Sequence, residues 1–499
     1  MSISNLTGMR IALVIPRNSK IGKKSFYDYK FIVDFTFSKK YFSYLLAIPV
    51  LLSLTPDEHE VRVFDENIED VDYDWPADLV GITARTMFAM RAYHIADRFR
   101  KRGVKTVLGG IHPSMCNDEA LQFCDSLVIG EAEHVWQNLL KDAQAGRLKR
   151  IYTDKHAADL TAFPKPVRSK LSMNRYLADI LQTTKGCPFQ CEFCSVYAYD
   201  GQRIRHKTIE QVLSEVTELH DSTTSFKKKS IFFADDNIIG DKKYARELFA
   251  AIKPYNLNWS CQASVNVSKE DELLQLMKES GCGAILIGFE SISEKNLSSM
   301  GKNINLKADY AEAINKIQSH GILVHSSFIL GYDYDTPQAF DDLIEFIQRN
   351  RLLMPLINIL TPFPGTKLLK RLEAEGRIIH KNWSEYDTET VVFRPSLMTP
   401  DELTAEYKRV IRTVYSFDAI YQNLEHYWKI NLWKQSNRVD PIKFRYRLLF
   451  ALRLVSLFFS FNANRSRFIL RILPKVFNRR VRISTILTLM AYNDYAFTP

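Results

Sequence analysis

Three of the seven cysteines lie within one stretch of fourteen residues, Thr183 to Val196, which reads TTKGCPFQCEFCSV. Cys187, Cys191 and Cys194 are spaced C-x3-C-x2-C. Thiolates are soft ligands that suit iron-sulfur clusters, and three of them on one short loop can bind three corners of a cubane. The fourth iron then stays open to bind and reduce a ligand, so the spacing predicts a reactive cluster.

A structural zinc site and three unrelated core thiols are the alternatives. Structural zinc has four closed ligands, usually with a second Cys or His pair at short spacing nearby. Cys261 and Cys282 are isolated, and the one His-x4-His pair, His320 and His325, follows much later in an apolar strand pattern. The cluster is therefore the preferred interpretation.

The stretch resembles the signature of the radical S-adenosylmethionine superfamily, which combines this spacing with an aromatic residue before the last cysteine, here Phe193. The resemblance implies that the three cysteines hold a 4Fe-4S cluster whose open iron binds S-adenosylmethionine. In that family, reduction of the sulfonium releases a 5'-deoxyadenosyl radical, which abstracts hydrogen from the substrate. The protein supplies binding, orientation and exclusion of water.

Length and composition predict two or three globular domains, with 499 residues of which 46% are hydrophobic. The net charge is +10, and residues 441–499 contain eleven Lys or Arg but one acidic residue, Asp494, so the remainder is about neutral. Cysteines without disulfide-like spacing, and the lack of a signal-peptide pattern, imply a reducing cytoplasm. No run of 18 uncharged apolar residues occurs, so we predict no membrane span.

Residues 1–150 alternate short apolar runs with helical patterns, which predicts a parallel sheet of βαβ units. Ligands of such sheets lie at the carboxyl ends of the strands. The stretch Arg17 to Leu54 is expected to cover one edge of the sheet or a cofactor entrance. The predicted strands are Arg10–Pro16, Val61–Asn67, Ala77–Thr83, Lys105–Gly110 and Asp125–Glu133.

This half resembles the Rossmann-like cobalamin-binding domain that precedes the catalytic domain in one large subfamily of radical S-adenosylmethionine enzymes. The D-x-H-x-x-G motif that supplies an axial histidine in other cobalamin proteins is missing, since the first strand is followed by PRNSKIG. A domain that keeps the fold but has lost the corrin is the alternative. His112 is expected to be a hydrogen-bonded loop residue and not a cobalt ligand. The cobalamin contacts implied by the resemblance are Thr83, Gly109, Gly110, Gly130 and Glu131.

Residues 151–177 are predicted to be a linker, with prolines at 164 and 166 and few periodic apolar residues. Residues 178–377 contain a second βα series, in which Ser268 and Asp271 are expected to cap one helix. Six units instead of eight predict a partial (β/α)6 TIM-like barrel, with its site where the strands end. The predicted strands are Ala178–Thr184, Ser230–Asn237, Trp259–Asn266, Gly283–Ser291, Leu323–Gly331 and Pro355–Thr366.

Polar residues fall at the ends of these strands. Asp235, Asp236 and Asn237 follow the second strand, where carboxylates suit an ammonium group. The resemblance implies that they hold the amino group of S-adenosylmethionine, and a helix N-cap is the alternative. Gln262 and Ser264 alternate along the third strand, so both are expected to face the lumen and the same cofactor.

Two further contacts of S-adenosylmethionine rest on the resemblance. Glu290 ends the fourth strand in IGFES, where the family places a residue near the ribose or sulfonium. Gly331 in FILGYDYDTP matches a strand that packs against adenine, although the family usually has Glu where this chain has Asp335. TPFPGT at Thr361 to Thr366 resembles a recurrent loop of the subfamily, with a plain turn as the alternative. No residue is identified as catalytic in its own right.

Residues 378–499 are predicted to form a basic, mostly helical region. A stretch such as RYRLLFALRLVSLFFSF is typical of a helix packed on a core or of a helix on a membrane surface. Nucleic acid is not expected as a partner, because the apolar content is high and no nucleic-acid module is present.

These features favour an α/β radical S-adenosylmethionine enzyme of the cytoplasm, with peripheral membrane contact as an option. Its expected reaction is cobalamin-dependent methylation of an unactivated carbon. The expected partners are a small-molecule substrate, lipid-like by the composition of the tail, and an electron donor such as flavodoxin or ferredoxin. Two alternatives stay open: a radical cyclase, oxidase or rearrangement enzyme with or without cobalamin, and a non-enzymatic cluster or corrin-binding sensor.

Overall fold

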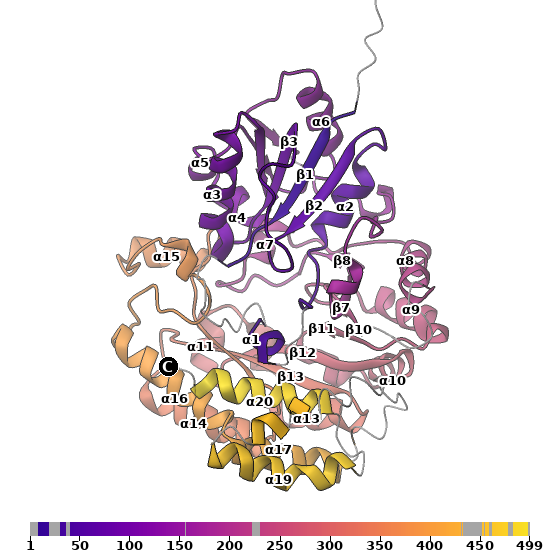
Figure 1. Cartoon of the computed structure of the whole chain (residues 1–499). Coiled ribbons are helices and arrows are strands. Elements are labelled where there is room, and N and C mark those ends of the chain that lie inside the picture. The colour runs from indigo at the N-terminus through magenta and orange to yellow at the C-terminus, as the bar shows by residue number, and fades with distance from the viewer. Residues whose placement is uncertain are drawn as a thin grey trace, which may run out of the picture.

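The computed structural model describes residues 8–18, 30–35, 40–154, 156–221, 230–430, 432, 452–453, 455–458, 462–477 and 483–497. Two six-stranded parallel sheets dominate these residues. Figure 1 shows the amino-terminal sheet above the second sheet, with the carboxyl-terminal helices on the far side of the second sheet. The predicted α/β class with two sheets is therefore confirmed.

The amino-terminal sheet is buried on both faces, which is why its strands read as continuous apolar runs. Helices α2 (Ala47–Leu54) and α6 (Trp136–Gln144) cover one face. Helices α3 (Ala89–Arg100), α4 (Ile111–Met115) and α5 (Asn117–Ala120) cover the other. In spatial order the strands are β2 (Glu60–Asp65), β1 (Arg10–Ile15), β3 (Leu79–Thr83), β4 (Lys105–Gly109), β5 (Ser126–Ile129) and β6 (Ile151–Thr153).

The sixth strand differs from expectation, because β6 lies within the segment predicted as linker. It pairs with β5 in parallel, with Leu127 opposite Ile151. Only Tyr152 of its three residues is buried. Three residues are too few to show the alternation of a strand in the sequence. The strand forms because the free edge of β5 provides backbone hydrogen-bond partners.

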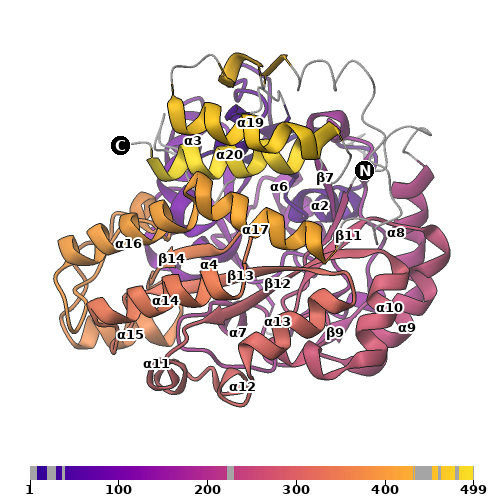
Figure 2. The same cartoon turned by 90° about the horizontal axis from the view of Figure 1, so that it is seen from below.

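The second sheet contains the six predicted barrel strands, all parallel and in sequence order. Figure 2 shows helices α9, α10, α13 and α14 around the outside of this curved sheet. The strands are β7 (Ala178–Leu181), β10 (Ser230–Phe233), β11 (Trp259–Gln262), β12 (Cys282–Glu290), β13 (Leu323–Leu330) and β14 (Leu356–Ile359). The helices of this domain are α7 (Val196–Tyr199), α8 (Ile209–Asp221), α9 (Lys242–Ile252), α10 (Asp271–Ser280), α11 (Glu294–Ser299), α12 (Asn303–Leu306), α13 (Tyr310–Ser319), α14 (Pro337–Arg349) and α15 (Lys367–Ala374).

The predicted cap of α10 is wrong. Ser268 lies in a 3-10 turn, Val265–Lys269, and its hydroxyl donates to the carbonyl of Val265 at 2.9 Å. The N-cap position of α10 is Glu270, which makes no side-chain capping bond. Asp271 is therefore the first helical residue and not the third.

The carboxyl-terminal helices pack on the barrel domain. They are α16 (Pro400–Val414), α17 (Phe417–Lys429), α19 (Ala463–Phe477) and α20 (Ile483–Phe497). The rings of Tyr492 in α20 and Phe31 in α1 (Lys30–Phe35) lie 5.1 Å apart, so the last helix packs against the first one. Most of the predicted amphipathic stretch, residues 445–461, lies outside the described residues. Among the described helices, none is long and apolar enough to cross a membrane.

Candidate active site

The cysteine loop begins after β7 and is held by the residues that follow β10. Asp235 is wholly buried and accepts hydrogen bonds from the backbone N–H groups of Thr183 at 2.6 Å and Thr184 at 3.0 Å. It also accepts one from the Thr183 hydroxyl. Asp236 accepts one from the N–H of Gly186 at 3.0 Å. The backbone that leads into Cys187 is therefore fixed by two carboxylates of the neighbouring strand.

Gly186 reverses the chain just before the first cysteine. Its φ of 93° lies in the left-handed region, and a Cβ at this position would lie 2.5 Å from the carbonyl oxygen of Arg203. This turn lets β8 (Thr184–Lys185) pair antiparallel with β9 (Arg205–His206). The close approach requires glycine here.

The three thiols lie close enough to interact electrostatically. Burial raises the pKa of Cys194 to about 12, and Cys191 and Cys187 add to this increase. Burial is also the largest cause of the raised pKa of Cys187 and of Cys191. Lys302 opposes the rise at all three thiols. Thiols in this environment ionise when a positive charge lies next to them, and the iron ions of a cluster supply that charge.

Among the described residues, no three His, Cys, Asp or Glu side chains are arranged around a single metal ion. A cubane would use the three thiols of this loop, because each thiolate would bind a different iron.

The three polar residues after β10 make different contacts. The Asp235 carboxylate is occupied by the cysteine loop, whereas the Asn237 Oδ1 accepts from the N–H of Ser264 at 3.1 Å. Asp236 is only partly buried, and burial raises its pKa to about 6. The helix-cap alternative is wrong, since Asp241 caps α9. Of the two carboxylates, Asp236 alone is partly exposed.

Gln262 and Ser264 both lie partly exposed after or within β11, as their alternation predicts. The Ser264 hydroxyl lies 3.3 Å from the Asn237 Oδ1. This contact ties the end of β11 to the end of β10, so the two predicted cofactor positions are structurally linked.

Glu290 lies at the end of β12 in a strained conformation, with a φ of 64° next to a register shift in the strand. Its carboxylate is nearly buried and forms an ion pair with Lys302 at 3.1 Å. Sequence reasoning missed Lys302, because a lysine in a short connection between helices carries no periodic signal. It is the cation that acts on all three thiols.

Gly331 follows β13 and is covered by protein. A Cβ there would lie 2.5 Å from a methyl carbon of Leu403 in α16. Its N–H donates to Asp335 at 2.8 Å, and Asp335 also accepts from the Asn296 amide at 2.7 Å. The glycine is therefore explained by packing of α16, and its predicted adenine contact stays a prediction.

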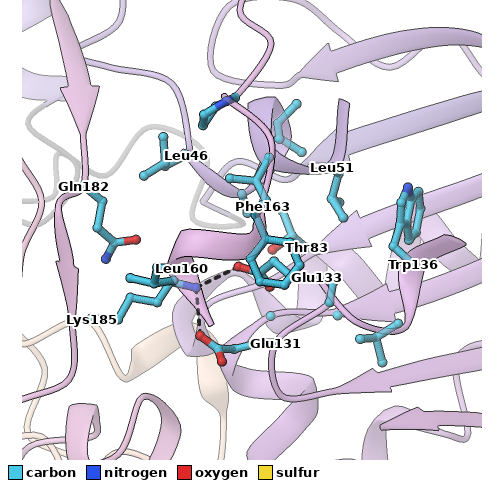
Figure 3. Close-up of a pocket in the computed structure, with 18 of the residues that line it drawn as sticks. Leu46, Leu51, Thr83, Glu131, Glu133, Trp136, Leu160, Phe163, Gln182 and Lys185 are labelled. Carbon is cyan, nitrogen blue, oxygen red and sulfur yellow. Dashed lines mark hydrogen bonds and ion pairs between the residues drawn. The ribbon is translucent and has the colours of Figure 1, made fainter. Parts of the chain in front are cut away.

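A cavity of about 400 Å³ lies between the carboxyl ends of the two sheets. The five predicted cobalamin residues line it, together with Gln182 and Lys185 at the start of the cysteine loop. Helix α2 contributes Leu51 and adjoining apolar residues to the lining. Figure 3 shows Leu51 and Trp136 on one side of this space and Gln182 and Lys185 on the other.

Glu131 joins the cavity to the cysteine loop. Its carboxylate accepts from Lys185 at 2.9 Å, from Arg205 at 2.8 Å and from the N–H of Ala158 at 2.7 Å. Lys185 also pairs with Glu133 at 2.9 Å (Figure 3). These nearby cations lower the pKa of Glu131 against the effect of its burial. Most of its hydrogen-bonding capacity is directed at protein.

His112 is fully buried and is not among the residues that line the cavity. Its Nε2 lies 3.0 Å from the Tyr93 hydroxyl. The expectation of a hydrogen-bonded histidine agrees with this position, which is in the first turn of α4 and not in a loop.

Two family models match the chain. The Radical SAM superfamily model matches residues 181–347, and a domain of unknown function, DUF4070, matches residues 366–498. Bacteriochlorophyllide d C-12(1)-methyltransferase of Chlorobaculum tepidum is 32% identical over 387 residues, which are 76% of this chain and 84% of that protein. Hopanoid C-2 methylase of Rhodopseudomonas palustris is 29% identical over 436 residues, or 85% and 80% of the two chains.

The fold is also similar to that of a solved structure, the cobalamin-dependent S-adenosylmethionine radical enzyme OxsB with aqua-cobalamin and S-adenosylmethionine bound. The TM-score is 0.63 at 13% sequence identity, covering 99% of this chain and 84% of the other. At this identity the likeness concerns the arrangement of sheets and helices alone.

Proposed function

This chain belongs to the radical S-adenosylmethionine superfamily, and from that premise we propose that it is a cobalamin-dependent methyltransferase. Its cofactors are a 4Fe-4S cluster, S-adenosylmethionine and cobalamin, and its reaction is methylation of an unactivated carbon. When bound, these groups supply reductive cleavage of S-adenosylmethionine, hydrogen abstraction and methyl transfer.

One observation carries the proposal: the carboxyl ends of strands of the first sheet and the segment between β7 and the cysteine loop line one cavity. Thr83, Gly109 and Gly130 come from the first sheet, and Gln182 and Lys185 come from the segment that leads from β7 into Cys187. A methyl donor held by the first sheet would therefore lie next to the radical-generating site of the second.

The lining of the cavity leaves backbone open to a corrin at Gly130, which has a φ of 82° and no atom within 4 Å of an added Cβ. Gly110, with a φ of 94°, is required by packing within the chain, because a Cβ there would lie 2.8 Å from the Thr83 hydroxyl. No histidine is among the lining residues, so the described chain offers no axial imidazole there. Corrin binding would depend on shape and backbone contacts.

In this proposal, Cys187, Cys191 and Cys194 hold the cluster and Lys302 offsets its negative charge. Asp236 receives the amino group of S-adenosylmethionine, because it is the carboxylate after β10 that retains free surface. Gln262, Ser264 and Glu290 complete the cofactor contacts from β11 and β12. Asp235 holds the cysteine loop and Asn237 holds Ser264, so both are positioning residues.

Peripheral membrane contact through the carboxyl-terminal region is part of the proposal. Leu452, Val455 and Leu470 expose 55%, 52% and 57% of their surface, and Leu470 is close in sequence to the exposed Arg467 and Arg471. Apolar and cationic side chains in this combination suit an anionic lipid surface. Binding of Leu470→Asp to acidic vesicles should fall relative to the wild type, and equal sedimentation would contradict this part.

An electron donor of the flavodoxin or ferredoxin kind would supply the reducing electron.

The experiment for the reaction class uses protein reconstituted anaerobically with iron, sulfide and cobalamin, then incubated with S-adenosylmethionine and dithionite. Formation of both 5'-deoxyadenosine and S-adenosylhomocysteine supports methylation, because one reports radical formation and the other reports loss of the methyl group. 5'-Deoxyadenosine alone favours a cyclase, oxidase or rearrangement enzyme. Neither product from protein with an intact cluster favours a sensor.

A further inference from the structure

The strands of the second sheet bury their two faces unequally. Outward side chains are almost fully buried beneath the helices, for example Phe233, Ile287 and Phe328, each at 0% exposure. Inward side chains are partly exposed, except Ala178 at the start of β7, of which 5% is exposed. A closed barrel fills its interior with side chains, so this lumen retains open space. The partly exposed inward positions are Ile180, Ser230, Phe232, Ser260, Gln262, Ala284, Leu286, Gly288, Leu323, His325, Ser327, Ile329, Leu356 and Asn358.

The chemistry of these positions is uniform. None of the inward residues of the six strands is Asp, Glu, Lys or Arg. The charged groups Asp236, Glu290 and Lys302 lie at or beyond the carboxyl ends of the strands. Below that rim the walls are uncharged, and apolar side chains such as Phe232 and Leu286 alternate with hydroxyl and amide groups such as Ser260 and Asn358. Charged ligands lose hydration in such a space without gaining a partner.

His325 is the one titratable side chain among the inward positions of the six strands. Within the described part of the chain its ring has no hydrogen-bond partner, although it is mostly enclosed. Burial lowers its pKa to about 4, so the imidazole is neutral and offers one donor and one acceptor. Most buried polar groups in proteins are paired, and an unpaired group that faces open space points to a ligand.

The register of the sheet places this ring beside the predicted cofactor row. Gln262 is opposite Leu286, and Leu286 is opposite His325. Neighbouring strands are about 4.8 Å apart, so the backbone positions of Gln262 and His325 are separated by roughly 10 Å. A ligand that contacts His325 would therefore lie next to S-adenosylmethionine held at Gln262.

We propose that the barrel lumen binds an uncharged, largely apolar part of the substrate and that His325 recognises a hydroxyl or carbonyl group on it. This inference rests on the proposed function and names the substrate class of the same site. A hydroxyl can donate to the unprotonated ring nitrogen or accept from the protonated one, whereas a carboxylate or phosphate would meet no cationic side chain at the inward positions of the six strands.

Three probes test this class in the full chain: 1-naphthol, naphthalene and 1-naphthoate, each measured by isothermal titration calorimetry. They share one apolar body and differ in the polar group. The wild type should bind 1-naphthol about 3- to 10-fold more tightly than naphthalene, as one added hydrogen bond predicts. 1-Naphthoate should bind more weakly than 1-naphthol.

His325→Leu should abolish the preference for 1-naphthol, and His325→Asn should keep part of it because the amide still hydrogen-bonds. Ala284→Phe fills the lumen and should weaken both neutral probes, which separates the lumen from the cavity at the other sheet. His94→Leu, at an exposed position on α3, should behave as the wild type. A preference unchanged in His325→Leu, tight binding of 1-naphthoate, or binding unaffected by Ala284→Phe would each overturn the inference.

Production of 5'-deoxyadenosine from S-adenosylmethionine by reconstituted wild-type protein is measured on the same preparation. If the probes behave as expected and no 5'-deoxyadenosine forms, the proposed function fails while the lumen site stands. If 5'-deoxyadenosine forms and the probe preferences are missing, the assignment of His325 fails alone.

Discussion

Lys185, two residues before the first cysteine of the loop, forms a 2.9 Å ion pair with Glu131 of the amino-terminal domain. Both side chains are largely buried, with 16% and 9% of their surface exposed. Glu131 also accepts a hydrogen bond from Arg205. Arg205 lies opposite Lys185 in the backbone pairing of β8 with β9. The cysteine loop and the cavity between the sheets are thus joined by a buried charge network.

Lys185→Met should destabilise the protein by about 3 kcal/mol, because Glu133 loses its cation and Glu131 loses one of two cations while both stay buried. Chemical denaturation followed by circular dichroism measures this loss. Lys253→Met is the matched control, since its pair with Glu279 is exposed and should leave stability nearly unchanged. Equal effects of the two substitutions would contradict the role of the buried network.

Lys302→Met should lower the midpoint potential of the cluster, because it removes a positive charge that acts on all three thiols. One unit charge at about 8 Å in an effective dielectric of about 20 corresponds to roughly 90 mV. Redox titration monitored by electron paramagnetic resonance measures the change. Lys302→Arg keeps the charge and should keep most of the potential. A midpoint that does not move in the Met variant would show that Lys302 is not coupled to the cluster.

Asp235→Asn should reduce the iron content after reconstitution and cost about 2 kcal/mol of stability. An amide oxygen replaces a carboxylate that accepts three hydrogen bonds from Thr183 and Thr184, and bonds to a charged acceptor are the stronger kind. Iron and sulfide assays and denaturation measure the two effects. Asp241→Asn is the control, because Asn caps helices as well as Asp. Full iron content in Asp235→Asn would contradict the anchoring role.

Acid should destabilise the protein through His325, whose folded-state pKa is lowered to about 4 by burial. The unfolded state, with a pKa of about 6.5, binds more protons between these values, so stability is lost as pH falls from about 6.5 to 4. Because the ring partly faces lumen water, the loss is about 1–3 kcal/mol. His325→Asn should show a correspondingly smaller loss in urea denaturation across this pH range. An identical pH dependence in both proteins would contradict a neutral, enclosed imidazole.

The sheets could be predicted because their strands obey simple patterns. Buried parallel strands read as apolar runs, and all five predicted amino-terminal strands and all six barrel strands are present. The exceptions have no such pattern. Strand β6 is three residues long, and the position of Ser268 depends on where a 3-10 turn ends before α10.

Site residues could be proposed where chemistry is local in sequence, as in the three cysteines and the residues that follow each strand. The partners of those residues were not predictable. Lys302 meets Glu290, and Lys185 meets Glu131, through contacts between distant segments that only the fold creates. The same limit applied to Asp235, whose carboxylate accepts hydrogen bonds from the backbone that leads into the cysteine loop.

Electron paramagnetic resonance of the reduced, reconstituted protein before and after addition of S-adenosylmethionine is the most direct test of the account. We expect the signal of one reduced 4Fe-4S cluster, with g values that shift when the sulfonium compound binds the open iron, and loss of the signal in Cys191→Ala. Stoichiometric zinc in place of iron and sulfide, or a cluster signal that S-adenosylmethionine leaves unchanged, would contradict it.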